Sequence, residues 1–292
     1  LFLKGTKSNP VLYDLATGIQ FSPTSDILCA LEQGERIEVH KSQFNNQHLL
    51  SEKIILVPTI LTNHHFLDDV HLDISYACNM SCVHCYQPTN AELLNIGTIK
   101  TLIQDLSRIN VYKISISGGE PLLHPQIYEV FDLVQKYNIR LSSIFTNGTL
   151  INKIFIDYFK SFWSYSPEIM LSVDSLNKKT FETFRGNGTY EKVLKSLSLL
   201  LGNNFAVTIN TMVTNIHISE IESMYDIFST LPIQRWRIGT PKYSGSYKNN
   251  RSALDPARED LQSVYKNILS RYLEDYQKDE SIFDLQVEFA FH

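Results

Sequence analysis

Three cysteines lie within one short stretch of the chain, CNMSCVHCY, at Cys78, Cys82 and Cys85. The rest of the 292 residues contains one further cysteine, Cys29. Three thiolates at the spacing CxxxCxxC can bind three irons of a four-iron, four-sulfur cluster, which usually takes four thiolates. Because no fourth cysteine lies nearby, the fourth iron would stay open to an external ligand that binds through nitrogen and oxygen.

Zinc is the metal that competes with this interpretation. The three cysteines together with His84, or with a more distant histidine, could bind Zn²⁺ in a binding module without catalytic turnover. Structural zinc sites are usually built from paired CxxC-type hooks, and this chain contains no second hook. The spacing alone leaves both metals open, so the decision depends on the neighbouring motifs.

Six strand–helix repeats are predicted from about residue 70 onward, on the basis of apolar periodicity. The strands are predicted at 70–77, 111–117, 139–146, 167–174, 204–213 and 233–240, and the helices at 91–109, 125–137, 150–162, 189–201, 218–231 and 260–276. This alternation predicts a parallel sheet and an α/β fold. Six units suit a partial (β/α)6 TIM-like barrel, because a closed barrel needs eight. Residues 243–255 are predicted to be the longest irregular segment within the repeats.

A separate small α+β module is predicted at residues 1–66, followed by the barrel domain at 67–292. The stretch PVLYDLATGIQFS predicts a hairpin with Gly18 in its turn. The stretch SPTSDILCALEQG predicts a short helix, with Ser22 as its N-cap and Gly34 after its end.

Composition and charge argue against several classes of function. Hydrophobic residues make up 43% of the chain, enough for a large core, and the formal net charge is −5 without any basic block. We therefore expect no broad nucleic-acid-binding surface. No apolar run is long enough to span a membrane, and no signal peptide is visible. Four cysteines in a chain of this length do not form a disulfide framework, which favours a reducing, cytoplasmic location.

Four motifs follow one another in the order of the predicted strands. CNMSCVHCY, with Tyr86 after its last cysteine, follows the first strand, and ISGGEPLLHP follows on the second. TNGTLI follows the third strand, and LSVDS lies on the fourth. With these motifs in register, the chain resembles the radical S-adenosylmethionine (SAM) superfamily over about residues 70–240. The resemblance favours iron over zinc and implies a [4Fe–4S] cluster bound by Cys78, Cys82 and Cys85.

The same resemblance implies a SAM-binding site beside the cluster. Gly118 and Gly119 would let the backbone approach the methionine end of SAM closely, and Glu120 would accept a hydrogen bond from its α-ammonium group. Asn147 would contact the ribose, and Arg185 would pair with the methionine carboxylate. The ordinary alternatives are a Gly-Gly turn for the glycines, an Asn-Gly turn for Asn147, and a surface arginine or a helix cap partner for Arg185.

Three further side chains complete the expected cofactor site. Ser172 and Asp174 alternate with Val173, so both should face the same side of their strand, which in a barrel could be the cofactor side. Tyr86 would pack near the adenine, or else only in the core. His84 is expected to point away from the cysteines beside it.

The segment RWRIGTPKYSGS resembles the branch of the superfamily that carries a C-terminal cysteine-rich domain, called SPASM or twitch. The chain has no cysteine after Cys85, so auxiliary iron–sulfur clusters are expected only if it is truncated before such a domain, as its abrupt end suggests. The stretch YDLATGIQFSPTSDILCALEQG resembles part of the winged-helix module that binds leader peptides, and its strand edge could pair with a leader by strand addition.

Together these features predict an enzyme that cleaves SAM reductively and abstracts a hydrogen atom from a ribosomally synthesised peptide. Its expected partners are a precursor peptide and an electron donor such as flavodoxin or ferredoxin. The alternatives are radical SAM maturation of a folded protein, a cofactor precursor or an RNA and, in a different class, the zinc-stabilised binding module. The bond that is formed and the residue that receives the product radical are not predicted.

Overall fold

The computed structural model describes residues 69–87, 92–278 and 283–288, together with short stretches at 2–6, 9–13, 20–22, 24, 26–27, 37–40 and 53–56. The chain divides into two compact units. Unit 1 comprises Leu1–Leu72, Leu94–Ser115 and Gln126–Ser142, and unit 2 comprises Asp73–Leu93, Ile116–Pro125 and Ser143–His292. Every predicted site residue belongs to unit 2.

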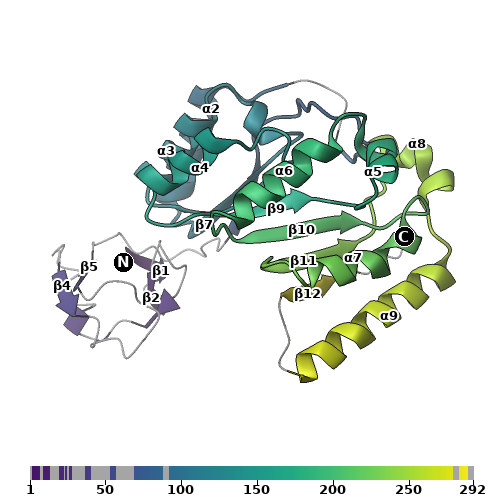
Figure 1. Cartoon of the computed structure of the whole chain (residues 1–292). Coiled ribbons are helices and arrows are strands. Elements are labelled where there is room, and N and C mark those ends of the chain that lie inside the picture. Colours follow the sequence, from purple (N-terminus) through teal and green to yellow (C-terminus); the bar gives the residue numbers. More distant parts are fainter. Residues whose placement is uncertain are drawn as a thin grey trace. The chain divides into compact units, whose positions relative to one another are not determined.

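A seven-stranded sheet has the strand order β12-β11-β10-β9-β8-β7-β6. Its strands are β6 (Asp69–Asp73), β7 (Lys113–Ser117), β8 (Arg140–Thr146), β9 (Glu168–Ser172), β10 (Val207–Met212), β11 (Arg235–Gly239) and β12 (Asp284–Val287). The successive pairs from β8 to β12 are parallel, and β9, β10 and β11 lie side by side in Figure 1. Because β6 and β12 are the two ends of this order, the sheet is open and the predicted partial barrel is confirmed.

Helices connect the successive strands, so the six predicted strand–helix repeats are confirmed. They are α2 (Ile96–Arg108), α3 (Ile127–Lys136), α4 (Lys153–Phe162), α5 (Lys178–Arg185), α6 (Tyr190–Leu201), α7 (Ile221–Phe228), α8 (Gly245–Leu254) and α9 (Arg258–Gln277), with short 3₁₀ helices at Pro121–Leu123 and Ile218–Glu220. None of the helices in the described residues is both long and apolar enough to cross a membrane.

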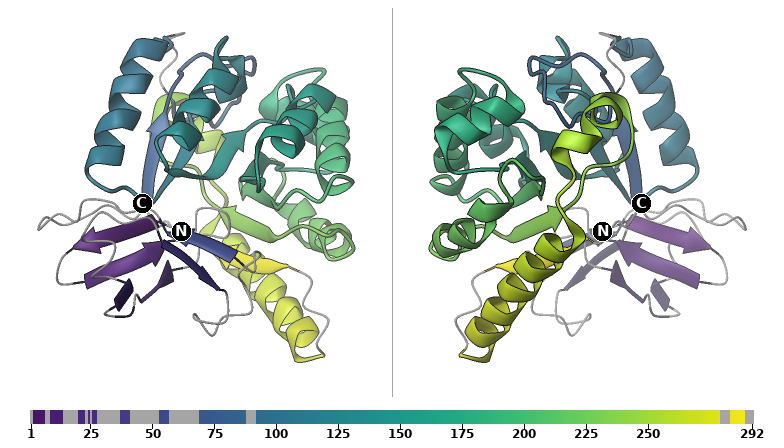
Figure 2. Two further views of the ribbon diagram at one scale, coloured as in Figure 1. Left: turned by 90° about the vertical axis from the view of Figure 1, so that its left-hand side faces the viewer. Right: turned by 90° about the vertical axis from the view of Figure 1, so that its right-hand side faces the viewer.

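Two elements near the C-terminal end differ from the prediction. The expected irregular segment 243–255 is wrong, because Gly245–Leu254 form α8. The seventh strand, β12, was not expected, and it pairs with β11 in parallel. Figure 2 shows α8, α9 and β12 in the yellow-green to yellow part of the chain.

Asparagine side chains cap the N-termini of three helices. Asn95 accepts a hydrogen bond from the N–H of the third residue of α2, and Asn152 does the same for α4. Asn177 accepts from the N–H groups of Lys179 and Thr180 at the start of α5. Each cap satisfies backbone donors that have no partner within the helix, which is typically worth about 1 kcal/mol.

The central strands of unit 2 bury one face completely, as expected where helices cover a parallel sheet. Residues Ile169 and Leu171 of β9, Ile209 of β10, and Trp236 and Ile238 of β11 have no exposed surface. On the other face Asn210 and Met212 of β10 and Arg237 of β11 are half-buried. The indole N–H of the tryptophan donates to the hydroxyl of Thr211 at 2.9 Å, so its one polar atom is satisfied in the core.

The described stretches of the N-terminal region form two small antiparallel sheets. One sheet has three strands, β1 (Phe2–Thr6), β2 (Asn9–Tyr13) and β3 (Gln20–Phe21), and the other has two, β4 (Ile37–His40) and β5 (Lys53–Leu56). The pairing of β2 with β3 agrees with the predicted hairpin. Its turn at Gly18, most of the predicted helix after Ser22, and the predicted domain boundary at residue 66 lie outside the described residues.

Candidate functional site

The cysteine loop, residues 74–87, directly follows β6. The N–H of Ile74 donates to the carbonyl of Ser117 at 3.0 Å, at the carboxyl end of β7. The N–H of Tyr76 donates to the carbonyl of Glu92 at 2.8 Å, which ties the start of the loop to the chain that leaves it. The motif therefore lies at the carboxyl end of the strands, where β/α folds build their active sites.

The turn of Gly118, Gly119 and Glu120 docks against the entrance of this loop. The N–H of Gly119 donates to the carbonyl of Ser75 at 2.6 Å, and the N–H of Glu120 donates to that of Ala77 at 2.9 Å. A Cβ atom at Gly118 would lie 2.1 Å from the Ser75 carbonyl oxygen, and one at Gly119 would lie 2.6 Å from that of Ala77. The first glycine also has a φ of +145°, which L side chains rarely adopt. Both glycines thus let two backbone segments of this chain meet, and their approach to methionine stays a prediction.

Glu120 has no exposed surface and forms the centre of a hydrogen-bond network. Its carboxylate accepts from the N–H groups of Leu122 at 3.0 Å and Asn147 at 2.7 Å, and from the hydroxyl of Thr146 at 2.9 Å. Burial raises the pKa of Glu120 from 4.5 to about 7, although these hydrogen bonds lower it. The Thr146 hydroxyl lies within hydrogen-bond distance of both carboxylate oxygens, at 2.9 and 3.0 Å, so three donors make four contacts with this carboxylate. Its predicted hydrogen bond with the α-ammonium group of SAM stays a prediction.

Asn147 connects this network to the cysteine loop. Its amide nitrogen donates to Asn79 Oδ1 at 2.8 Å and lies 3.7 Å from Cys78 Sγ. Its amide oxygen accepts from the N–H and the hydroxyl of Thr149 at 2.9 and 2.7 Å. Its predicted contact with ribose stays a prediction. Neither Thr146 nor Asn79 was predicted as a site residue. The sequence signal that could have identified them is that each is adjacent to a predicted site residue.

Asp174 and Arg185 form a buried ion pair, with 0% and 8% of their side chains exposed. The carboxylate of Asp174 also accepts from the N–H of Met212 at 2.8 Å, and Arg185 Nη1 lies 3.9 Å from Cys82 Sγ. The alternative of a surface arginine is therefore wrong, while the pairing of Arg185 with a cofactor carboxylate stays a prediction. Ser172, at the end of β9, is half-buried, and its predicted cofactor contact also stays a prediction.

The three motif cysteines are free thiols on one loop. Burial raises the pKa of Cys82 to about 11, Arg185 opposes this effect, and Asp174, Cys78 and Cys85 add to it. All three lie within eight residues of the chain. Within the described part of the chain, however, no three His, Cys, Asp or Glu side chains meet around one point as in a finished metal site.

The chemistry of this donor set fits an iron–sulfur cluster better than zinc. Cysteine thiolates are the usual protein ligands of such clusters, and this loop carries three cysteines. His84, which could have been a fourth zinc ligand, is buried with its ring stacked on Phe184 at 4.1 Å between centroids. Burial lowers the pKa of His84 to about 3, as expected for a ring that packs in the core. Iron would have to displace the proton of the Cys82 thiol, because the thiolate is the form that binds metal.

Helix α8 covers the last part of the cysteine loop, which sequence reasoning missed. Gly245 begins α8 with a φ of +54°, and a Cβ atom there would lie 2.4 Å from the carbonyl oxygen of Cys85. The side-chain amide of Asn250 donates to the carbonyl of Val83 at 2.9 Å. The only sequence signal was a glycine at the point where α8 begins.

Tyr86 is 42% exposed, so the alternative that it packs only in the core is wrong. Its hydroxyl accepts from the amide of Gln87 at 3.2 Å, and Lys242 Nζ lies 5.6 Å from its ring centroid. An exposed aromatic face beside the cysteines suits a flat ligand, and the predicted adenine contact stays a prediction.

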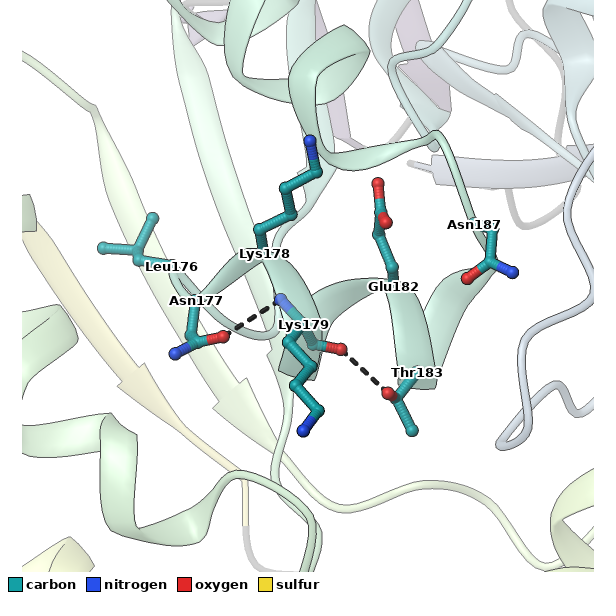
Figure 3. Close-up of a pocket in the computed structure, with 7 residues that line it drawn as sticks. All are labelled: Leu176, Asn177, Lys178, Lys179, Glu182, Thr183 and Asn187. Carbon is teal, nitrogen blue, oxygen red and sulfur yellow. Dashed lines mark hydrogen bonds between the residues drawn. The ribbon is translucent and has the colours of Figure 1, made fainter.

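An open hollow of about 740 Å³ lies beside α5. It is lined by Leu176, Asn177, Lys178, Lys179, Glu182, Thr183 and Asn187. Figure 3 shows that the hydrogen bonds among these residues are those of the start and first turn of the helix itself. No predicted site residue lines this hollow, so we assign the cofactor chemistry to the cysteine loop.

Comparison with known proteins gives a family match over most of unit 2 and part of unit 1. The model of the radical SAM superfamily matches residues 72–228. The antilisterial bacteriocin subtilosin biosynthesis protein AlbA of Bacillus subtilis is 28% identical over 158 residues, which are 52% of this chain and 34% of AlbA. The GTP 3′,8-cyclase of Chlorobaculum tepidum is 30% identical over 167 residues, 55% of this chain and 50% of that protein. The PqqA peptide cyclase of Gluconobacter oxydans is 23% identical over 195 residues, 65% of this chain and 54% of that protein. The chain thus spans about a third to a half of the length of these relatives.

Solved structures share the fold. Streptococcus suis SuiB bound to S-adenosylmethionine matches with a TM-score of 0.63 and 18% identity, over 77% of this chain and 51% of SuiB. SuiB bound to its precursor peptide SuiA matches with a TM-score of 0.69 and 15% identity, over 99% of this chain and 71% of SuiB. At these identities the likeness supports the architecture alone.

Proposed function

This chain belongs to the radical SAM superfamily, and on that premise we propose that it uses a [4Fe–4S] cluster and SAM to abstract a hydrogen atom from a ribosomally synthesised peptide. The observation that carries the proposal is the junction of two motifs. The CxxxCxxC loop and the Gly-Gly-Glu turn share backbone hydrogen bonds at the carboxyl end of the strands. This junction brings three thiols and a buried carboxylate into one region.

In the proposed mechanism, Cys78, Cys82 and Cys85 would hold the cluster through three of its irons, and the fourth iron would be left for SAM. When bound and reduced by one electron, the cluster supplies the chemistry that splits a carbon–sulfur bond of SAM, yielding methionine and, after hydrogen-atom transfer from the substrate, 5′-deoxyadenosine. Glu120 accepts a hydrogen bond from the α-ammonium group and so orients the amino-acid end of SAM. Its burial supports this role, because a charge-assisted bond is stronger where water is excluded.

The peptide substrate is supported by the relatives. AlbA is named for the biosynthesis of a bacteriocin, and another relative is named as a peptide cyclase. The proposed electron source is a low-potential donor such as flavodoxin or ferredoxin, in the cytoplasm. The GTP 3′,8-cyclase, at 30% identity, favours a small nucleotide as the second candidate substrate.

The test is isotope transfer under anaerobic conditions. The reconstituted chain is incubated with SAM, dithionite and a deuterated copy of a short peptide encoded beside its gene. The proposal expects deuterium in the 5′-deoxyadenosine that forms. Formation of 5′-deoxyadenosine without deuterium from the peptide contradicts the peptide substrate, and turnover of GTP in a parallel reaction would favour the second candidate.

A further inference from the structure

The Asp174–Arg185 pair joins three separate parts of unit 2. Asp174 follows β9, and its carboxylate accepts from Arg185 Nε and from the N–H of Met212, the last residue of β10. Arg185 is the last residue of α5. Both side chains are almost fully removed from water, so their charges act on their neighbours with little screening.

The arginine end of the pair contacts the cysteine loop. Arg185 Nη1 lies 3.9 Å from Cys82 Sγ, within hydrogen-bond distance for sulfur. The N–H of Val83, next to this cysteine, donates to the carbonyl of Phe184 at 3.1 Å, so the end of α5 is fixed to the loop by the backbone as well. The guanidinium group is therefore held against one particular thiol.

We propose that the Asp174–Arg185 pair positions Cys82 and sets the charge beside it, so that the arginine favours the reduced cluster and the aspartate limits that effect. This inference rests on the proposed cluster. It gives Arg185 a partner within the protein, in addition to the predicted partner on SAM. Hydrogen bonds to the sulfurs and net local charge are two of the factors that set cluster potentials.

The two members of the pair must then act in opposite directions. One-electron reduction adds negative charge to the cluster, and the nearby cation stabilises that charge. Replacement of Arg185 by glutamine removes the cation and a donor to sulfur, so the midpoint potential should fall. Replacement of Asp174 by asparagine leaves the cation without its counter-charge, so the potential should rise.

The experiment is a potentiometric titration of the reconstituted full chain, with dithionite as reductant and the reduced cluster followed by electron paramagnetic resonance. We expect D174N and R185Q to shift the midpoint potential in opposite directions, each by at least a threefold change in the ratio of reduced to oxidised cluster at a fixed potential. A tenfold change is about 59 mV for one electron. The matched control is R271Q, which breaks the more exposed ion pair of Arg271 with Asp226 and should leave the potential unchanged.

A second variant protects the test against misfolding, because either single substitution leaves a buried charge unpaired. The double variant D174N/R185Q leaves none, and its potential should lie below that of the unaltered protein. Shifts of both single variants in the same direction, or shifts no larger than that of R271Q, would overturn the inference. An unaltered chain that takes up no iron would contradict the proposed function instead, so the two failures are distinguishable.

Discussion

Replacement of Glu120 by glutamine tests the proposed SAM site most sharply. The substitution keeps the shape of the side chain and removes its charge. Loss of a hydrogen bond to a charged group costs about 1.5–3 kcal/mol, so SAM affinity should fall by about ten- to a hundredfold. The exposed Glu191, which pairs with Lys178 on the surface, provides the matched control E191Q.

The pH dependence of SAM affinity gives this prediction a second, independent readout. Burial raises the pKa of Glu120 to about 7, so the carboxylate is mostly protonated at pH 6 and mostly charged at pH 7.5. The ammonium group of SAM needs the charged form, so affinity must rise with pH. The ionised fraction of Glu120 grows about eightfold between these pH values, so SAM affinity should rise by up to about eightfold. In E120Q this rise should disappear.

The assay is anaerobic calorimetry of SAM binding to the cluster-loaded chain at pH 6, 6.5, 7 and 7.5. If Glu120 had only a structural role, its replacement by glutamine would lower SAM affinity equally at every pH. The affinity of the unaltered protein would then also be the same at every pH. Two results would refute the assignment of Glu120 to the ammonium group. One is a SAM affinity of the unaltered protein that does not change with pH, and the other is an affinity of E120Q that rises with pH as that of E191Q does.

Two further predictions concern the cover of the cysteine loop and the N-terminal region. Gly245→Ala should accelerate iron loss in air, because its Cβ atom would meet the carbonyl oxygen of Cys85. The control is Gly188→Ala, at a glycine that also has a positive φ but has open space around the added Cβ atom. Equal iron loss in the two variants would contradict the role of α8. Deletion of residues 1–66 should weaken precursor binding, measured by fluorescence anisotropy, while uncoupled 5′-deoxyadenosine formation stays nearly constant. Unchanged precursor affinity would defeat the leader-binding prediction, and a joint loss of stability and SAM cleavage would mean that the segment only covers the barrel.

Local patterns predicted most of the sheet. The buried strands β7 to β11 carry continuous or alternating apolar residues, so their order and spacing were visible in the sequence. Helix α8 was not, because only Tyr247 and Leu254 of its residues are buried and the rest are small or polar. The strand β12 is short and alternates between exposed and half-buried residues, which gives no apolar signal of its own.

The site shows the same division between local and distant information. The cysteine spacing and the Gly-Gly-Glu turn are local, and they identified the motifs. The contact of Gly118 with the backbone of Ser75 and the pairing of Arg185 with Asp174 arise only when separate strands and helices are assembled. The sequence could therefore name these residues, while their partners within the protein required the structure.

The central claim is that the cysteine loop holds a cluster that cleaves SAM. The most direct measurement compares iron content and dithionite-driven 5′-deoxyadenosine formation in the anaerobically reconstituted chain and in the variant with Cys78, Cys82 and Cys85 all changed to alanine. The control changes Cys29, which lies outside the described residues. We predict that the triple variant loses both iron and 5′-deoxyadenosine formation, while the Cys29 variant keeps both. Full iron retention in the triple variant, or a colourless unaltered protein with stoichiometric zinc, would contradict the account.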